Sequence, residues 1–230
     1  VGETKEGPVV RGLRTLATLA PISDEMIVYP NRPRDPDEPD YAIAFAIPMN
    51  TPGLKIICRD LYAEHADPER QPLTTRFDEV DAALIFDDVV VPWERVFVYK
   101  DPKLLAGINY IHTWGQYSTM LRLVTKLEAF LGVAQLLTKY AKRNMLPQSQ
   151  ILLSSMIQDI EILRSCIQVG ESRGYRAEGG TWAPLLSAAY RVHSIEASDR
   201  AERTMEGLLT STLMLSGGAS DLNNADIGPF

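Results

Sequence analysis

The spacing of apolar residues along the chain changes near residue 100. Before that point, short apolar runs stop at prolines and turn residues, as strands do. Eleven of the fifteen prolines fall in the first 100 residues, and proline is scarce inside helices. The pattern predicts an antiparallel β-barrel or sandwich over residues 1–100, with long surface loops at 31–40 and 64–71. The expected strands are 9–10, 26–29, 41–47, 54–58, 82–86, 89–91 and 95–99.

After residue 100, apolar residues recur at steps of three and four, which is the helical period. Three such stretches are evident: 120–137, 153–167 and 205–213. Pro147 separates the first from the second, and Gly174 with Gly179-Gly180 separates the second from the third. Thr181 with Pro184 has the pattern of a helix start. We therefore predict a second domain over residues 101–230, an antiparallel helical bundle.

Composition and charge narrow the functional classes. Apolar residues make up 45% of the chain and charged residues 23%, as in an average globular protein. No apolar run reaches the roughly 18 residues of a membrane helix. The net charge of −7 excludes a basic nucleic-acid footprint. Two cysteines form neither a disulfide framework nor a zinc site alone, so we expect a reducing, cytoplasmic compartment. The chain begins Val1-Gly2-Glu3, without Met, and we expect an internal piece of a longer protein.

Few residues have the arrangement of a known catalytic motif. GxGxxG, phosphate-loop and GxSxG motifs are absent from the sequence, and the three histidines lack metal-ligand spacing. Asp24-Glu25 is an acid–base candidate or a solvated turn. Thr74-Thr75-Arg76, followed by Asp78-Glu79, offers hydroxyls and charges or is a turn with a local ion pair. The aromatic segment 109–117, which includes His112, is an ordinary domain junction or the wall of an aromatic-substrate pocket.

Two segments carry a family resemblance. Residues 72–82, PLTTRFDEVDA, and residues 86–96, FDDVVVPWERV, resemble the 4-hydroxyphenylacetate 3-monooxygenase family. Weaker matches lie at 10–12, 40–42, 122–127 and 221–224.

The resemblance implies an α+β, acyl-CoA-dehydrogenase-like fold: a central antiparallel β-barrel, then an antiparallel helical bundle. The family's N-terminal helical domain would be missing from this chain. The resemblance also implies that the complete protein is a homotetramer. It would take reduced FAD from a separate NAD(P)H-dependent flavin reductase. With O₂ it would hydroxylate a phenol ortho to its hydroxyl group. In such enzymes the flavin carries the oxygen chemistry, and the protein positions it in a dry cavity.

The resemblance also implies a site. In the phenylacetate hydroxylases, the loop after the strand matching Thr15–Leu19 carries a histidine beside the flavin, and this sequence has Asp24 there. We expect Asp24 to be catalytic, as a base toward the phenol or as the partner of a substrate ammonium. Thr74 and Thr75 are expected to join it in binding substrate, with both segments lining one cleft. The expected cofactor-binding residues are Asp24, Glu25, Met26, Asn31 and Arg32.

The sequence leaves the substrate and two alternative functions open. Because Asp24 replaces a histidine, a tyrosine-like or carrier-tethered phenol is as plausible as a 4-hydroxyphenylacetate-like one. A second function with this fold is that of the 4-hydroxybutyryl-CoA dehydratases, which hold an iron–sulfur cluster. That cluster needs three cysteines and a histidine, and this chain has two cysteines. The third interpretation is a non-catalytic flavin-binding fragment.

Overall fold

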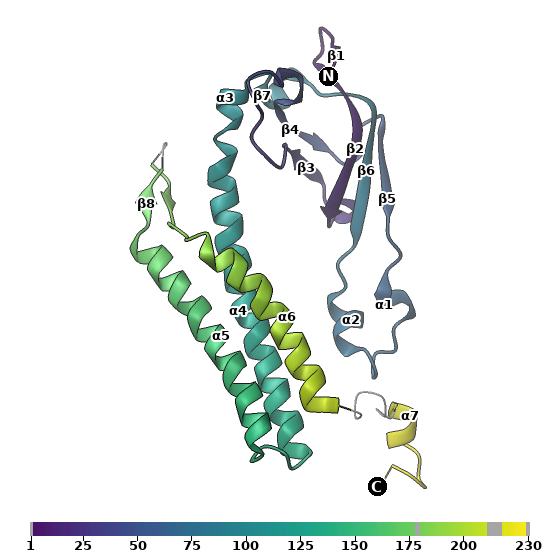
Figure 1. The fold of residues 1–230 in the computed structure, drawn as a ribbon. Coiled ribbons are helices and arrows are strands. Elements are labelled where there is room, and N and C mark those ends of the chain that lie inside the picture. The colour runs from purple at the N-terminus through teal and green to yellow at the C-terminus, as the bar shows by residue number, and fades with distance from the viewer. Residues whose placement is uncertain (1, 178–179, 211–217, 229–230) are drawn as a thin grey trace. The chain divides into compact units, whose positions relative to one another are not determined.

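The chain divides into two compact units in the computed structural model, Val1–Ile108 with Gly217–Phe230 and Asn109–Ser216. The structure describes residues 2–177, 180–210 and 218–228, with the side chains of all except residues 108–112, 219 and 222. The first unit holds the main sheets and the second holds the long helices (Figure 1). Within the described residues, no helix is both long enough and apolar enough to cross a membrane.

Two antiparallel sheets build the first unit. One has the order β1-β2-β6-β5, with β1 Gly2–Glu3, β2 Pro8–Thr18, β6 Asp81–Val90 and β5 Leu54–Cys58. The other has the order β3-β4-β7, with β3 Glu25–Val28, β4 Ile43–Pro48 and β7 Val96–Tyr99. Phe45 and Ile47 from β4 pack with Leu84 and Phe86 from β6 in one apolar core. The α+β class is therefore confirmed, with both sheets contributing to that core.

The expected closed barrel is not formed by the described strands, which corrects our prediction for residues 1–100. The strands β3 and β7 have only four residues each, and Pro30, Pro48 and Pro92 lie at or near strand ends, where they supply no N–H. Two register shifts in β2, the longest strand, bend its ladder with β6. The segments 82–86 and 89–91, predicted as two strands, largely form the single strand β6.

Short helical segments lie between these strands or follow the last of them. They are η1 Ala20–Ile22, η2 Pro39–Tyr41, α1 Tyr62–His65, α2 Pro72–Phe77, η3 Trp93–Arg95 and α3 Pro102–Leu105. The helix α1 takes up the start of the loop expected at 64–71. The turn before β5 needs Gly53, which has φ +86° and would place a Cβ 2.5 Å from the Asp87 carbonyl oxygen.

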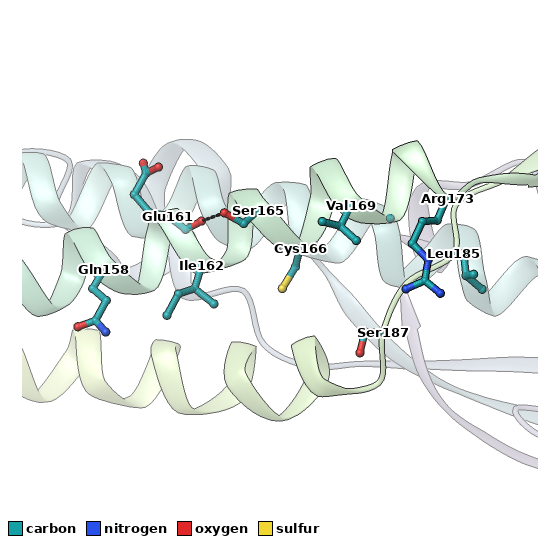
Figure 2. Close-up of a pocket in the computed structure, with 10 residues that line it drawn as sticks. Gln158, Glu161, Ile162, Ser165, Cys166, Val169, Arg173, Leu185 and Ser187 are labelled. Carbon is teal, nitrogen blue, oxygen red and sulfur yellow. Dashed lines mark hydrogen bonds between the residues drawn. The ribbon is translucent and has the colours of Figure 1, made fainter.

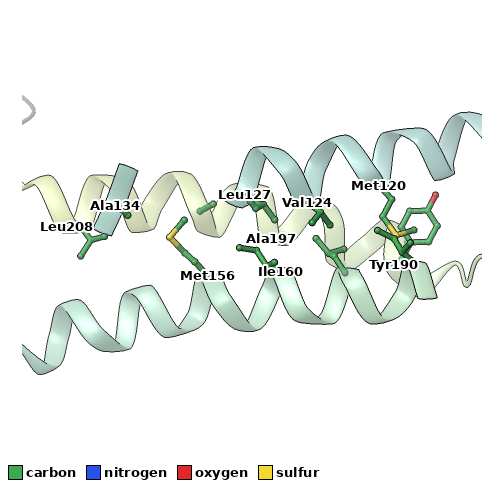
Figure 3. Packing of buried hydrophobic residues seen from close by; sticks show 12 residues of the cluster. Met120, Val124, Leu127, Ala134, Met156, Ile160, Tyr190, Ala197 and Leu208 are labelled. Atoms are coloured by element: carbon green, nitrogen blue, oxygen red, sulfur yellow. The ribbon is translucent and has the colours of Figure 1, made fainter. Parts of the chain in front are cut away.

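Three long helices build the second unit: α4 Ile108–Tyr140, α5 Pro147–Ser172 and α6 Ala189–Leu209. Figure 3 shows their shared core, where Met120, Leu127, Met156 and Ile160 meet Ala197 and other buried residues. Pro147 separates α4 from α5 as predicted, and it is the first residue of α5. The helix start expected at Thr181–Pro184 is wrong, because Tyr175–Arg176 (β8) pairs there with Trp182–Ala183 (β9) and α6 begins at Ala189. Residues 211–213 of the third expected helix lie outside the described residues, and α7, Ala219–Leu222, follows them.

Candidate functional site

Two of the predicted site segments adjoin the same end of the β2–β6 strand pair. Thr18, the last residue of β2, pairs with Asp81, the first residue of β6, and the Leu19 N–H donates to the Val80 carbonyl at 2.8 Å. The helix η1 and Asp24 follow Thr18 closely along the chain, while α2, which carries Thr74 and Thr75, shortly precedes Asp81. Their common origin favours a shared cleft, which stays a prediction.

Asp24 lies on a fixed backbone with an exposed side chain. Its carbonyl accepts the Met49 N–H at 3.0 Å, and the neighbouring Ser23 hydroxyl donates to the Leu19 carbonyl at 2.8 Å. Among the described residues, no hydrogen bond or ion pair reaches the Asp24 carboxylate. The carboxylate is therefore open to a ligand while the backbone that carries it is held in place.

The strand β3 points its side chains alternately outward and into the core. Glu25 and Ile27 are exposed, with Ile27 66% exposed, whereas Met26 is half-buried against the core. The Glu25 carboxylate accepts a hydrogen bond from Arg95 at 3.0 Å, and this bond with the Arg95 charge lowers the pKa of Glu25. A cofactor on the outer face of β3 would therefore meet Ile27, which we did not predict and which the period-2 alternation of the sequence could have indicated.

Asn31 and Arg32 lie beyond the other end of β3. A strand of four residues spans roughly 13 Å, so Asp24 and Arg32 are not one compact site. The Arg32 guanidinium donates to both Glu38 carboxylate oxygens, at 3.2 and 3.1 Å. The same loop holds Arg34, whose guanidinium lies 5.8 Å from the Tyr41 ring centroid and whose buried Nε has no hydrogen-bond partner in the part of the chain described. A ligand that reached both ends of β3 would need to be elongated.

Thr74 and Thr75 lie in the short helix α2. A turn with a local ion pair is one of the two interpretations that the sequence allows for this segment, but Pro72 at the first turn of the helix favours helix formation there. The Thr75 hydroxyl is within 3.2 Å of two backbone acceptors, the carbonyls of Gln71 and Pro72. Thr74 is half-buried, and its hydroxyl makes no hydrogen bond among the described residues, so it is the freer of the two donors.

The aromatic segment at the start of α4 packs on itself. Trp114 lies 5.9 Å from Tyr117 and 5.7 Å from Trp182 between ring centroids, in edge-on arrangements. The Tyr117 hydroxyl donates to the Glu171 carboxylate, and that hydrogen bond raises the pKa of Tyr117. The Trp114–Trp182 contact joins the β8–β9 pair to α4, and the Tyr117–Glu171 hydrogen bond joins α4 to α5. The side chain of His112, which we had singled out, lies outside the described residues.

A hollow of about 460 Å³ runs along α5 in the second unit. Ile162, Cys166 and Val169 line it along α5, and Figure 2 shows Arg173 and Leu185 at one end of the row of lining residues. None of the predicted site residues lines it. Ile162 and Val169 lie outside the apolar stripe of α5 that forms the core, and we made no prediction for them from the sequence. Among the described residues there is no cluster of three potential metal ligands, and both cysteines are free thiols.

Two family models match nearly the whole chain. The model described as 4-hydroxyphenylacetate 3-hydroxylase N terminal covers residues 1–98, and the C-terminal model of the same name covers residues 105–230.

Named relatives agree with these models. The chain is 36% identical over 169 residues to the 4-hydroxyphenylacetate 3-monooxygenase oxygenase component of Thermus thermophilus, covering 72% of this chain and 35% of that protein. It is 31% identical to the FADH(2)-dependent monooxygenase TftD of Burkholderia cepacia, over 85% of this chain and 38% of the relative. It is 29% identical to the 4-nitrophenol 4-monooxygenase/4-nitrocatechol 2-monooxygenase oxygenase component of Rhodococcus opacus, over 100% of this chain and 44% of the relative. The chain thus spans less than half the length of these relatives.

Solved structures give the same fold. A crystal structure of the oxygenase component HpaB with FAD and 4-hydroxyphenylacetate matches all of this chain with a TM-score of 0.85 and 30% identity, using 49% of its own length. An archaeal 4-hydroxybutyryl-CoA dehydratase from N. maritimus matches all of this chain and 47% of its own with a TM-score of 0.81 but only 16% identity. The second likeness is one of fold alone, and nothing in the described site favours the dehydratase interpretation.

Proposed function

The chain belongs to the 4-hydroxyphenylacetate 3-hydroxylase family, and on that premise we propose that it is part of the oxygenase component of a two-component flavin-dependent monooxygenase. The complete protein would use reduced FAD and O₂ to hydroxylate a phenol ortho to its hydroxyl group. The observation that carries this proposal is the match of the two family models to residues 1–98 and 105–230.

The surface around Asp24 fits a flavin ring in chemical terms. Ile22 and Ile27, on either side of Asp24 in the chain, are 74% and 66% exposed, and a flavin ring has apolar faces and a polar edge. We place the ring over this surface, with Asp24, the backbone of Met26 and the Thr74 hydroxyl at its edge. When bound, FAD supplies the oxygen chemistry, and the protein residues orient the substrate and move its proton.

Asn31 and Arg32 would hold the polar part of the cofactor. An elongated dinucleotide can reach from Asp24 to the far end of β3, where these two residues lie. Arg32 is paired with Glu38, so its guanidinium would bind a diphosphate only by exchanging that carboxylate. Glu25 forms a surface ion pair with Arg95, and it would contribute to cofactor binding through that pair.

Asp24 would accept the phenol proton. Its carboxylate is exposed and open, and a positioned general base typically contributes about 10²–10⁴ in rate. In the complete gene product, Asp24→Asn should slow hydroxylation by that order and leave flavin reduction by the reductase unchanged. If Asp24 instead binds a substrate ammonium, the variant should mainly raise KM for amine-bearing phenols. Glu94→Gln, an exposed acid in the same unit, is the control. Unchanged kcat and KM on every phenol would remove Asp24 from both roles.

The substrate is a phenol whose identity is decided by assay. The named relatives act on 4-hydroxyphenylacetate and on 4-nitrophenol, so both belong in the panel, together with tyrosine and a carrier-tethered tyrosine. The assay supplies FAD, NAD(P)H and a flavin reductase to the complete gene product and looks for the catechol. If no phenol is hydroxylated while reduced FAD is bound, the protein binds flavin without this activity.

We also propose that the complete protein works with a separate reductase and forms a homotetramer. The term "oxygenase component" in the relatives' names supports the first part of this proposal. Exposed apolar side chains on the long helices support the second, among them Val169 on α5 and Ile195 on α6, which is 73% exposed. Light scattering of the complete gene product should give four times the subunit mass.

A further inference from the structure

The segment between β5 and β6 is closed at its base. Cys58 pairs with Ala82 where the two strands part, and the Arg59 N–H donates to the Asp81 carbonyl at 3.0 Å. The segment 59–80 then carries α1 and α2 before the chain returns to the sheet. The hydrogen bonds where β5 and β6 part therefore determine the position of the α2 side chains that a ligand could contact.

Arg59 uses its whole guanidinium at that base. Nη1 donates to the Asp60 carbonyl at 2.7 Å, and Nη2 donates to Asp78 Oδ1 at 2.5 Å and to the Glu79 carbonyl. Nε reaches Asp81 Oδ2 at 3.5 Å. The guanidinium also lies 4.4 Å from the Tyr62 ring centroid, a cation–π contact, and its planar fork of donors is one that a lysine would not reproduce.

Asp78 joins the two short helices. Its side chain is 8% exposed, and Oδ2 accepts the Ala63 N–H at 3.0 Å. The N-cap residue of α1, Leu61, has no side chain to do this, so a carboxylate from just after α2 caps α1 instead. The Arg59 hydrogen bond first, and the Ala63 amide second, hold the pKa of Asp78 below its usual value.

We propose that Arg59 and Asp78 are positioning residues that set the place of α2, and with it the Thr74 hydroxyl, relative to the substrate. The inference rests on the proposed function. Neither residue touches substrate in this role. They hold α2 at its C-terminal end and through α1, so that the Thr74 hydroxyl is kept in one orientation.

The test compares Asp78→Asn and Arg59→Lys with wild type in the complete gene product, at a temperature where all of them are folded. Removing hydrogen bonds to a charged group should loosen the segment, and KM for the phenol should rise about tenfold with kcat within about twofold. Amide hydrogen exchange over residues 60–78 should quicken by about the same factor. Lys55→Gln is the matched control, because Lys55 on β5 pairs with Asp87 on β6 at 2.8 Å with both side chains more than half exposed.

The outcomes separate the two proposals. A purely structural role would lower the thermal midpoint and the active fraction but leave KM of the folded enzyme unchanged, and that result overturns the positioning role. If Asp78→Asn does not fold, the same comparison is made with Arg59→Lys. That substitution keeps the positive charge but removes the forked set of guanidinium donors. Failure of the proposed function would show in the wild type, which would hydroxylate no phenol. If the wild type is active but the positioning role is wrong, the folded Asp78→Asn and Arg59→Lys variants would have the KM of the wild type.

Discussion

Gly174 illustrates how closely single residues pack in the helical unit. It follows α5, and a Cβ added there would lie 2.3 to 2.4 Å from three atoms of the Trp182 indole. An indole is rigid and is held here by Trp114, so it cannot move aside cheaply. Gly174→Ala should therefore destabilise the unit by about 1–3 kcal/mol, as overpacking does. Urea unfolding followed by tryptophan fluorescence measures this change.

Gly132 provides the control for that substitution. It lies exposed in the middle of α4, and an added Cβ would meet nothing within 4 Å. Gly132→Ala should stabilise the same unit by about 0.5–1 kcal/mol through helix propensity. If Gly174→Ala were as stable as wild type, Trp182 would not pack on Gly174 in solution.

Asp159 and Arg200 form a partly buried ion pair between α5 and α6. Asp159 is 7% exposed, and two guanidinium nitrogens of Arg200 donate to its two oxygens at 3.0 and 2.8 Å. Arg200→Met should cost about 2–4 kcal/mol, near the lower end for a broken buried pair because the arginine is 41% exposed. The double variant with Asp159→Leu should recover most of the loss. Equal losses in single and double variants would contradict the coupling.

The sequence indicates which residues are candidates for the site, but it does not show where their side chains point. Asp24 lies on a short connection with an open carboxylate, which fits the resemblance that selected it. Met26 was selected with its neighbours, yet the alternation along β3 turns its side chain to the core. The partner of Arg32, Glu38, lies six residues away in an irregular loop, where no periodicity indicates which charges meet.

At the scale of elements, the α1–α2 segment should respond to acid. Arg59 lowers the pKa of Asp78 in the folded state. The contribution of the Asp78 carboxylate to the free energy of unfolding is therefore fully present above its unfolded pKa of about 4. It should be lost as pH falls through the folded value. The stability difference between wild type and Asp78→Asn should thus be largest near pH 7 and shrink below about pH 4. Urea midpoints at pH 7, 5 and 3 measure it, and a pH-independent difference would contradict the ion pair.

Elements with a strong local signal were predicted, and elements that depend on distant pairing were not. Residues 54–58 form β5 as expected, and Pro147 begins α5, because turn residues and proline act locally. Barrel closure depends on strand length and on the register shifts in β2, which a period-2 pattern does not contain. The hairpin at Tyr175–Ala183 was missed because its strands have two residues each.

At the scale of the whole molecule, the core of the sheets and the core of the long helices have no buried residue in common among the described residues. We propose that the β and helical parts, expected from the sequence as residues 1–100 and 101–230, are separate folding domains. Leu163, fully buried in the helical core, tests this. Leu163→Ala should cost the helical domain about 2–5 kcal/mol and lower its thermal midpoint by roughly 4–8 °C for each kcal/mol.

Tryptophans report on the two parts separately. Trp93 lies in the first unit, while Trp114 and Trp182 lie in the second. With Trp93 as the only tryptophan, after Trp114→Phe and Trp182→Phe, and with selective tryptophan excitation, Leu163→Ala should leave the midpoint of the Trp93 signal unchanged. Phe45→Leu, in the core of the sheets, should instead lower it, because Phe45 is fully buried there. If Leu163→Ala moved the Trp93 signal as far as it moves the helical circular dichroism, the two cores would unfold as one domain.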